Sequence, residues 1–515
     1  MVEKYESVAG SSQSSLEIAT DRTPLLQDHR TAMGEKNIGI SQQTLVSNAG
    51  DVTNKAKKLP QYAAGLASTL GALAAGMVLA WSSPAGTDGV NLSGSYDFSI
   101  SPNQFSWISA LVPLGAATIC VPIGILADLV GRKTAMLMLV VPFMVGWALI
   151  IWANSVVMFY IGRFITGLSG GAFCVTAPMY TAEIAESEIR GSLGSYFQLM
   201  LTVGILLTYA LGMVTNMFQL SIISAIVPLI FFGVFFFMPE TPTYYIKKGN
   251  IDAARASLIR LRGPRYNVEP ELLAQRQSLS ETAENRGSFF TAIKSKAAIK
   301  GLIIAFGLMF FQQLSGINAI IFYANSIFNA TGTSLSANVS TIIVGVMQVV
   351  AVFVSSLIVD KLGRRILLLV SNFVMFVTAL IIGIYFYLKN NGHDVQAIAW
   401  LPLVAVCGFI ILFSLGYGPI PWMMIGEIFS SQIKGIAGSS ACLFNWLMAF
   451  VVTKFYSDLV NSVGMAIPFF IFAAVSAVGT VFVFFVVPET KGKSLDEIQQ
   501  ELGGNPVVAQ QGMKA

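Results

Sequence analysis

The stretch "LMFFQQLSGINAIIFYANSIF", Leu308 to Phe328, carries polar side chains inside a long apolar run. Its length suits a membrane-spanning helix, which needs about 20 predominantly apolar residues. Hydrocarbon cannot hydrogen-bond an amide, and burying one without a partner costs on the order of 2–7 kcal/mol. We therefore expect Gln312, Gln313 and Asn318 to face the interior of a helical bundle, and Gly316 to permit either a close approach of another helix or a local break.

The composition is that of a polytopic membrane protein. Of 515 residues, 54% are hydrophobic and 11% are charged, whereas about a quarter of the residues of a soluble domain are charged. The long uncharged runs predict an all-α membrane protein whose twelve transmembrane helices lie near residues 62–82, 106–127, 135–153, 157–177, 194–214, 218–238, 299–325, 340–359, 366–387, 399–424, 436–456 and 466–487.

Lys and Arg predict the orientation, because loops that face the cytosol are enriched in them. The five loops on the side of the two termini hold eighteen of these residues, and the opposite loops hold two, Lys389 and Lys454. We therefore expect both termini to be cytosolic. The modest net charge of +4 gives no reason to expect a nucleic-acid partner.

Three charged motifs recur at matching places in the two halves of the chain: "DLVGRK" (128–133) as "DKLGRR" (360–365), "EIAESEIRG" (183–191) as "EIFSSQIKG" (427–435), and "PET" (239–241) as "PET" (488–490). Such a repeat predicts two six-helix halves joined by a linker. We expect a disordered tail at 1–58, halves at 59–238 and 299–488, a linker at 239–298 and a tail at 489–515. Amphipathic helices are predicted in the linker near Ile251–Leu261 and Glu269–Ala283, the first capped by Asn250.

These motifs, with "GRFITGLSGG", "QQLSGINAIIFY" and "GPIPWMMIGEIF", resemble the sugar porters of the major facilitator superfamily over about residues 60 to 500. The chain is similar to facilitative glucose transporters and to insect facilitated trehalose transporters. The resemblance implies the major facilitator fold, with two pseudo-symmetric halves, and a neutral sugar as substrate. It also implies a sugar site lined by Gln198, Gln312, Gln313, Asn318, Trp422 and Asn445, to which Gln348 and Trp446 add matching groups.

The chemistry of these side chains suits a sugar. An amide donates and accepts hydrogen bonds, as a sugar hydroxyl does, and the apolar faces of a pyranose stack on Trp. The alternative is that the amides only join helix to helix. Ala449, Ser414 and Gln348 depart from the family pattern and leave the sugar open among trehalose, glucose and fructose. The small Ala449 would leave room for a disaccharide.

Charged residues at the cytosolic helix ends are expected to act as a gate. The resemblance suggests the pairs Glu183–Arg132, Arg190–Glu240, Glu427–Arg364 and Lys434–Glu489, with Asp128 and Asp360 in the same set. Such pairs would join the halves when the cytosolic side is closed, or would only anchor the helices at the interface. Pro419 and Pro421 in "GYGPIPW" predict a break in the tenth helix, which is expected to bend as the outer gate closes. Tyr323 of the seventh helix is expected to lie opposite this segment as the lid of that gate. Arg163, inside the fourth span, is expected to bind backbone carbonyls or neighbouring polar groups rather than the substrate.

The first span has no carboxylate, and this absence predicts how transport is driven. Proton-coupled sugar porters carry an Asp in the first span, where this chain has Val78. The prediction is a uniporter that works by facilitated diffusion; a proton symporter and a non-transporting sugar sensor are the alternatives. "KGKS" (491–494) lacks the glycine of a phosphate loop, so no ATP is expected.

The remaining signals concern targeting and modification. Asp21, Leu25 and Leu26 fit an acidic dileucine signal for a sorting adaptor, so an endosomal or lysosomal membrane is an alternative to the plasma membrane. Sequons at Asn91, Asn329 and Asn338 fall in predicted outer loops. The four cysteines are interpreted as small buried hydrophobes, and neither a metal nor a cofactor is expected.

Overall fold

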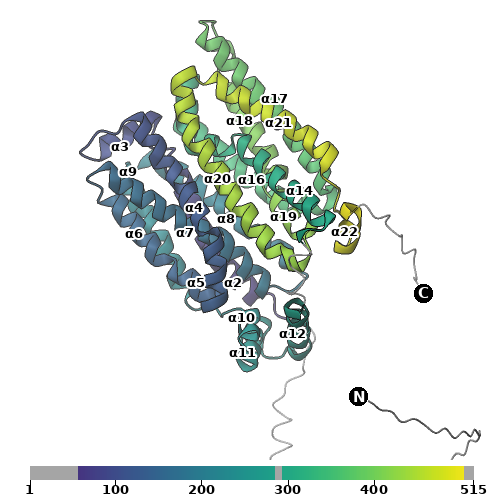
Figure 1. Ribbon diagram of the computed structural model, residues 1–515. Helices are drawn as coiled ribbons and strands as arrows, with labels where there is room; N and C mark the ends of the chain where they lie inside the picture. Colours follow the sequence, from purple (N-terminus) through teal and green to yellow (C-terminus); the bar gives the residue numbers. More distant parts are fainter. Residues whose placement is uncertain (1–55, 285–292, 504–515) are drawn as a thin grey trace, which may run out of the picture. The chain divides into compact units, whose positions relative to one another are not determined.

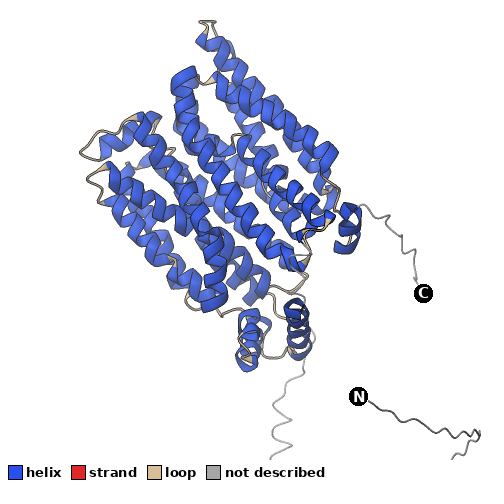
Figure 2. Cartoon of the chain, in the orientation of Figure 1, coloured by secondary structure: helices blue, strands red, loops and turns tan. Residues whose placement is uncertain are grey.

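The computed structural model describes residues 56–284 and 293–503, all within one compact unit, Thr53–Ala515. The sorting residues Asp21, Leu25 and Leu26 lie outside the described residues. Within the described range, twelve helical stretches are long and apolar enough to cross a membrane (Figures 1 and 2). The predicted all-α class and the twelve spans are therefore confirmed.

The first six spans form one half of the bundle, drawn in purple and blue in Figure 1. They are α2 (Leu59–Ala80), α4 (Pro102–Val130), α5 with α6 (Arg132–Met138 and Val140–Ile151), α7 (Val156–Ile184), α8 (Arg190–Val214) and α9 (Met217–Phe235). We call this set the N half.

The last six spans form the C half, drawn in green and yellow. They are α14 with α15 (Lys296–Leu314 and Ile317–Thr331), α16 (Ala337–Leu362), α17 (Arg364–Asn390), α18 with α19 (Leu401–Leu412 and Ile420–Ile428), α20 (Ser431–Val463) and α21 (Ala466–Val486). The two halves meet mainly where α4 packs on α20 and α8 packs on α16.

Short helices mark the two ends of the bundle. The linker helices α10 (Pro242–Lys247), α11 (Ile251–Arg262) and α12 (Glu269–Glu284) lie at the end that we call the linker end, as does α22 (Leu495–Gly503) (Figure 1). The opposite, far end carries α3 (Val90–Ser95). The predicted linker helices are confirmed, and the Asn250 side chain accepts a hydrogen bond from the Ala253 N–H at 3.0 Å, as expected of an N-cap.

The seventh and tenth spans are broken near the centre of the bundle, as predicted. Gly316 separates α14 from α15 with a φ of 94°, a conformation that costs most other residues free energy. Tyr323 adds a kink inside α15 with a φ of −119°. In the tenth span, a π-helical turn at Phe413–Tyr417 separates α18 from α19, and Pro419 caps α19.

Of the three sequons predicted in outer loops, Asn91 lies in the connection between the first two spans, and Asn329 and Asn338 lie at the helix ends that flank the connection between the seventh and eighth spans. Asn91 is on α3, Asn329 is in the last turn of α15, and Asn338 is in the first turn of α16. The Asn329 amide donates to the Asn325 side chain at 2.8 Å. The seventh and eighth helices extend beyond their apolar cores, because length and hydropathy alone do not define where a helix ends.

Replacing Gly316 with Ala is expected to destabilise the protein. The substitution forces a left-handed backbone on an L-residue, at about 1–2 kcal/mol, and places a Cβ against the Phe472 ring. The measurement is the thermal unfolding midpoint of the full chain in detergent. Gly233→Ala on α9, where an added Cβ meets nothing within 4 Å, is the control and should not lower the midpoint. Equal midpoints for the two variants would contradict the role of Gly316.

Candidate substrate-binding site

Four of the predicted amides meet at the break in the seventh span. Asn445 on α20 donates to the Gln312 Oε1 at 2.6 Å, and Gln313 donates to the Asn445 Oδ1 at 3.0 Å. Asn318, at the start of α15, donates to the Gln313 Oε1. All four side chains are buried. Their mutual hydrogen bonds satisfy groups that would otherwise be costly to bury.

Gln312 also supports the broken tenth span. Its Nε2 donates to the backbone carbonyls of Tyr417 at 2.7 Å and Gly418 at 3.1 Å. These carbonyls lie at the π-helical turn, where the regular helical pattern is interrupted. The bonds of Gln312 and Gln313 to Asn445 also join α14 to α20, so the alternative that the amides join helices fits this conformation as well. Among the described residues, the side chains of Gln313, Asn318 and Asn445 bond to other side chains.

Hydroxyls on neighbouring helices satisfy the rest of this break. The Ser371 hydroxyl donates to the Leu412 carbonyl at 2.7 Å and accepts from the Tyr417 N–H at 3.2 Å. Ser355 donates to the Leu415 carbonyl at 3.1 Å. The turn in the tenth span is thus held by side chains from α14, α16 and α17.

Trp446 faces an apolar surface of the N half. Its ring lines a cavity of about 10 Å³ together with Val78, Gly170 and Cys174. Its indole N–H is buried and has no acceptor among the described residues. Ligand pockets typically measure about 300–1,000 Å³, so this cavity does not hold a sugar in the present conformation.

Among the described residues, no hydrogen bond joins the other predicted site residues to the four amides. Gln348 on α16 is buried and Gln198 on α8 is half-buried, and no hydrogen bond of either side chain is found within the described part of the chain. Trp422, in the first turn of α19, is 39% exposed. Pro421 precedes it in the same turn and is buried.

The far end is closed by hydrogen bonds that the sequence did not predict. In a regular helix the Ile321 carbonyl would accept from the Asn325 N–H. Here the Ile321 carbonyl accepts from the Tyr209 hydroxyl at 2.8 Å, and the Asn325 N–H donates to the Ser83 hydroxyl at 3.1 Å. Ser82 donates to the next carbonyl, that of Phe322, at 3.2 Å. The backbone at the Tyr323 kink therefore bonds to the N half.

Tyr323 itself is buried at this kink. Its hydroxyl donates to the Thr453 carbonyl at 3.0 Å, and its ring lies edge-on to Phe105 of the N half, 6.1 Å between centroids. Below it, near the middle of the bundle, Cys120 and Cys442 meet across the halves with their Sγ atoms 3.2 Å apart. Both of these thiols are buried, as predicted, whereas Cys174 and Cys407 are only half-buried.

Lys454 is a second cross-half contact that sequence analysis missed. It was assigned to an outer loop, but it is buried inside α20. Its ammonium forms an ion pair with Asp458 at 2.6 Å and donates to Ser106 at 3.0 Å and Asn103 at 3.3 Å, both on α4. The sequence signal for this arrangement is the spacing of Lys454 and Asp458, because side chains four residues apart are neighbours on one face of a helix.

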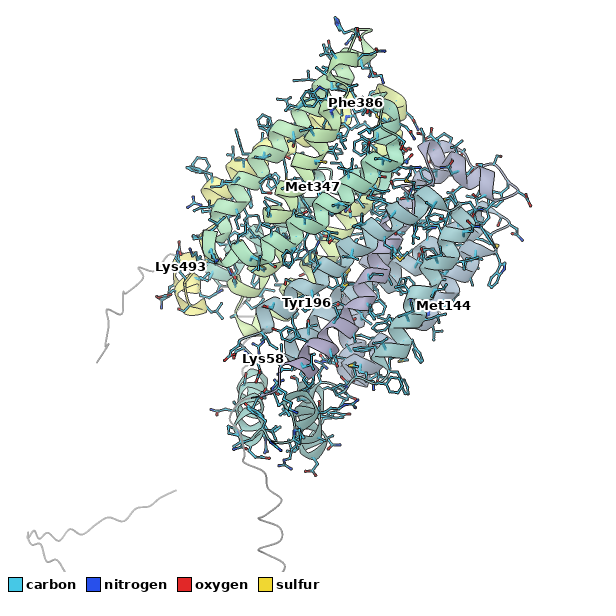
Figure 3. The ribbon with its side chains drawn as sticks, turned by 180° about the vertical axis from the view of Figure 1, so that it is seen from behind. Lys58, Met144, Tyr196, Met347, Phe386 and Lys493 are labelled. Atoms are coloured by element: carbon cyan, nitrogen blue, oxygen red, sulfur yellow. The ribbon has the colours of Figure 1, made fainter. Side chains whose placement is uncertain are left out.

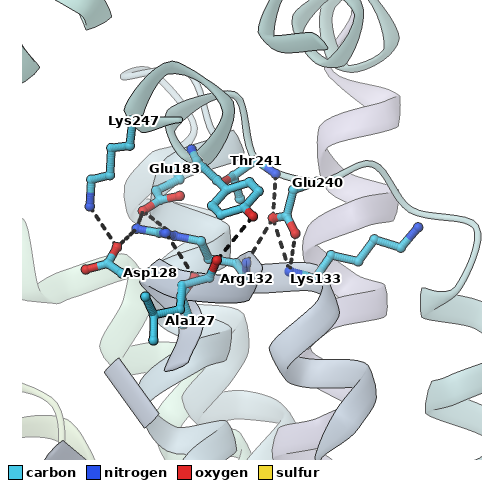
Figure 4. A network of polar contacts seen from close by, with 10 residues as sticks. Ala127, Asp128, Arg132, Lys133, Glu183, Glu240, Thr241 and Lys247 are labelled. Carbon is cyan, nitrogen blue, oxygen red and sulfur yellow. Dashed lines mark hydrogen bonds and ion pairs between the residues drawn. The ribbon is translucent and has the colours of Figure 1, made fainter. Parts of the chain in front are cut away.

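At the linker end of the N half, charged groups form a network around Arg132 (Figure 4). The buried guanidinium pairs with Glu183 at 2.9 Å and with Asp128 at 2.7 Å. Glu240 accepts from the backbone N–H groups of Arg132 and Lys133 at 3.0 and 2.9 Å. Burial raises the pKa of Glu240, and these N–H donors offset part of that increase.

The C half repeats this arrangement. Arg364 pairs with Glu427 at 2.9 Å, and Glu489 accepts from the N–H groups of Arg364 and Arg365 at 2.9 and 3.0 Å. Burial acts to raise the pKa of Glu489, but the backbone donors outweigh it and the pKa is lowered. The repeated motifs thus have the same structural role twice.

Two of the four suggested pairs are not formed. Arg190 donates to the Ala185 carbonyl at 3.3 Å instead of Glu240, and Lys434 donates to the Gly426 carbonyl at 2.9 Å instead of Glu489. The two pairs that do form lie within one half each, so they do not join the halves in this conformation. Asp360 is on α16, but its side chain is outside the described part of the structure.

Arg163 binds backbone carbonyls, as predicted. Its guanidinium donates to the carbonyls of Ile108 at 3.2 Å and Val78 at 2.9 Å and lies over the Trp81 ring. Val78 occupies the place where a proton-coupled porter would carry an Asp. In the described residues, Arg163 has no carboxylate partner.

Comparison with known proteins explains this architecture. The model of the family described as "Sugar (and other) transporter" matches residues 51–502. This chain belongs to that family. The predicted membership among the sugar porters is thereby confirmed, and the chain is a multi-pass membrane transporter rather than an enzyme.

Relatives in the family include insect proteins. The facilitated trehalose transporter Tret1 of Culex quinquefasciatus is 39% identical over 446 residues, which cover 86% of each chain. Tret1 of Polypedilum vanderplanki is 39% identical over 454 residues, or 88% of this chain and 90% of that one. Against Tret1 of Aedes aegypti, at 38% identity, this chain spans 55% of the relative's length.

Solved structures show the same fold. The partially occluded inward open conformation of the xylose transporter XylE from E. coli superposes with a TM-score of 0.71 at 23% identity, covering 84% of this chain and 99% of that one. XylE described as a proton:xylose symporter, bound to 6-bromo-6-deoxy-D-glucose, also gives 0.71, at 24% identity and with 86% and 99% coverage. This likeness confirms the major facilitator fold.

Lys454→Met is expected to favour opening of the far end, because charge-assisted hydrogen bonds contribute about 1.5–3 kcal/mol each. The reporter is a cysteine at Ser109, which is buried one turn below Ser106, in a chain whose native cysteines are replaced. Labelling by an impermeant maleimide from the far-end side should rise roughly tenfold.

Lys389→Met provides the matched control, since Lys389 is at the same end but donates to Ala330 within the C half. Its labelling rate should equal that of the parent. If Lys454→Met also labels at the parent rate, Lys454 does not hold the far end closed.

Proposed function

We propose that this chain is a facilitative sugar transporter, a uniporter that moves trehalose or hexoses such as glucose by alternating access. The observation that carries the proposal is the cluster of Gln312, Gln313, Asn318 and Asn445 beside the unpaired indole N–H of Trp446. These groups are uncharged and match the donors and acceptors of a sugar hydroxyl. The names of the Tret1 relatives agree with trehalose.

Sugar binding would replace hydrogen bonds between the amides with hydrogen bonds to the sugar. In the present conformation Gln313 and Asn318 satisfy each other, and the adjoining cavity is small. A sugar would enter as the halves separate, take the place of some of these bonds and accept the Trp446 N–H. Because each exchange is nearly balanced, affinity would be modest and release easy, which suits a carrier.

Alternating access is supported by the distribution of contacts between the halves. Among the described residues, the hydrogen bonds that we find between the two halves lie at the far end or near the centre, and those at the linker end stay within one half. With the termini in the cytosol, as the Lys and Arg distribution predicts, this conformation is closed to the outside. Opening the far end would break the bonds of Tyr209, Ser83 and Lys454.

Uniport is supported by the surroundings of Arg163. Proton coupling needs a group near the site that titrates during transport. The Arg163 guanidinium instead bonds the Val78 carbonyl, and a carbonyl does not titrate. The observation that favours the proton-coupled alternative is the fold shared with XylE, which is described as a proton:xylose symporter.

Other proposals concern organisation and location. We retain the domain boundaries at 59–238, 239–298 and 299–488, with cytosolic tails at 1–58 and 489–515. We place the protein in the plasma membrane, or in an endosomal or lysosomal membrane if Asp21, Leu25 and Leu26 bind a sorting adaptor. The three sequons remain candidates for glycosylation; Asn91 and Asn329 are exposed and Asn338 is half-buried.

Uptake should not depend on a pH gradient. Proteoliposomes with labelled trehalose, glucose or fructose should equilibrate to the same level with and without an inward proton gradient. The measurement is the plateau and the initial rate at equal external pH. Accumulation above equilibrium that collapses with a protonophore would establish the symporter instead.

Gln313→Ala and Asn318→Ala should each raise the half-saturation concentration of sugar uptake roughly five- to tenfold, as expected for one lost hydrogen bond. Asn391→Ala, an exposed amide that bonds the Tyr387 carbonyl at the far end, is the control and should have no effect. Unchanged half-saturation in both site variants would mean that the amides only hold helices together.

A further inference from the structure

A cleft of about 400 Å³ lies at the linker end of the C half, outside the sugar site. Its walls come from α14, from the end of α21 and from α22, the helix that follows Lys493 (Figure 3). Lys300 and Arg365 line it, together with apolar residues that include Ile303 and Phe485. The cleft therefore combines two cations with an apolar wall.

The polar groups of the cleft carry a net positive charge. Its one carboxylate, Glu501, is paired with Lys493 at 2.7 Å. Arg365 is oriented by its contact with the Phe484 carbonyl and lies over the Phe484 ring. The Arg365 Nε is buried, yet it has no acceptor among the described residues. A fixed guanidinium with an unpaired buried donor is suited to an anion.

The apolar wall opens toward the membrane. Phe485 is 78% exposed and Ile303 is 52% exposed, and both lie on helices that span the bilayer. Lys300 is near the start of α14 and Arg365 is in the first turn of α17, at the ends of membrane spans where headgroups lie. A ligand that satisfies both features needs a phosphate and an acyl chain.

The matching position of the N half has different neighbours. Lys133 matches Arg365 in the repeated motif and lies over the Phe236 ring. There, Arg260 of the linker helix α11 reaches the Phe237 carbonyl, and α10 packs beside α11. The linker helix α11 therefore contacts this end of the N half, whereas α22 lines the cleft in the C half.

We propose that this cleft binds an anionic glycerophospholipid, whose phosphate contacts Lys300 and Arg365 and whose acyl chain lies along Ile303 and Phe485. Basic pockets between membrane helices bind such headgroups on the cytosolic side, the side to which the Lys and Arg distribution assigns this end. The lipid would join α14, α21 and α22, and so would stabilise the C half.

The test uses the full chain, purified in detergent, and native mass spectrometry with added phosphatidylglycerol. Each cation near an anionic headgroup contributes about fivefold in affinity. Lys300→Gln with Arg365→Gln should therefore weaken retention of the tightest-bound lipid by roughly 25-fold. Lys133→Gln, the matched cation of the N half, should retain the lipid as the parent does.

Two further arms identify the ligand and guard against misfolding. Glycerophosphoglycerol, the headgroup without acyl chains, should not compete at the same concentration if the apolar wall contributes. Lys300→Arg with Arg365→Lys keeps both charges and should restore most of the retention. Equal lipid retention by the double Gln variant and the parent, or full competition by the free headgroup, would overturn the proposal.

Discussion

Backbone groups released by two broken helices determine much of this structure. A membrane helix hides its own N–H and C=O groups, and a break releases them where no water is available. The seventh span breaks at Gly316 and Tyr323, and the tenth breaks at Phe413–Tyr417. Each released group must then find a side chain. Gln312, Ser355 and Ser371 supply these partners in the tenth span, and so they fix how α14, α16 and α17 surround it.

The same requirement produces the closure at the far end. The Tyr323 kink turns a carbonyl and an N–H outward, and Tyr209 and Ser83 of the other half bond to them. These are neutral hydrogen bonds, each contributing about 1 kcal/mol net. When the far end opens, water can take their place. A closure built this way stabilises one conformation without making the other inaccessible, as a carrier requires.

The sequence predicted the features that depend on local chemistry. Apolar length predicts the spans, and the recurring motifs predict the repeat. The capping preference of Asn predicts the Asn250 cap, and Gly and Pro predict the two breaks. The cost of a buried charge predicts the carbonyl partners of Arg163. Features that depend on tertiary position did not follow. Gln312 and Gln313 are adjacent in sequence, yet one supports the tenth helix and the other does not.

Long-range pairing was predicted only in part, since Glu183–Arg132 and Glu427–Arg364 form and the other two suggested pairs do not. The suggested pairs Arg190–Glu240 and Lys434–Glu489 join charges of opposite sign, but Glu240 and Glu489 are already engaged by backbone N–H groups. The amino-acid sequence does not indicate which backbone N–H groups will bind a given carboxylate. Lys454 was misplaced because a lysine near the end of an apolar run suggests a loop, whereas its ion pair with Asp458 allows it to be buried.

The two halves carry the same charged motifs, but they differ in how freely their helices can rearrange. In the N half, α4 approaches α7 closely at Gly167 and α2 approaches α8 closely at Gly204, where a Cβ would collide with the facing backbone. Such backbone contact leaves little freedom. The C half has both broken spans and the four clustered amides. Because broken helices bend at lower cost than intact ones, the amides proposed to bind the solute belong to the half that is able to rearrange, and the N half provides a rigid, apolar surface against which they close.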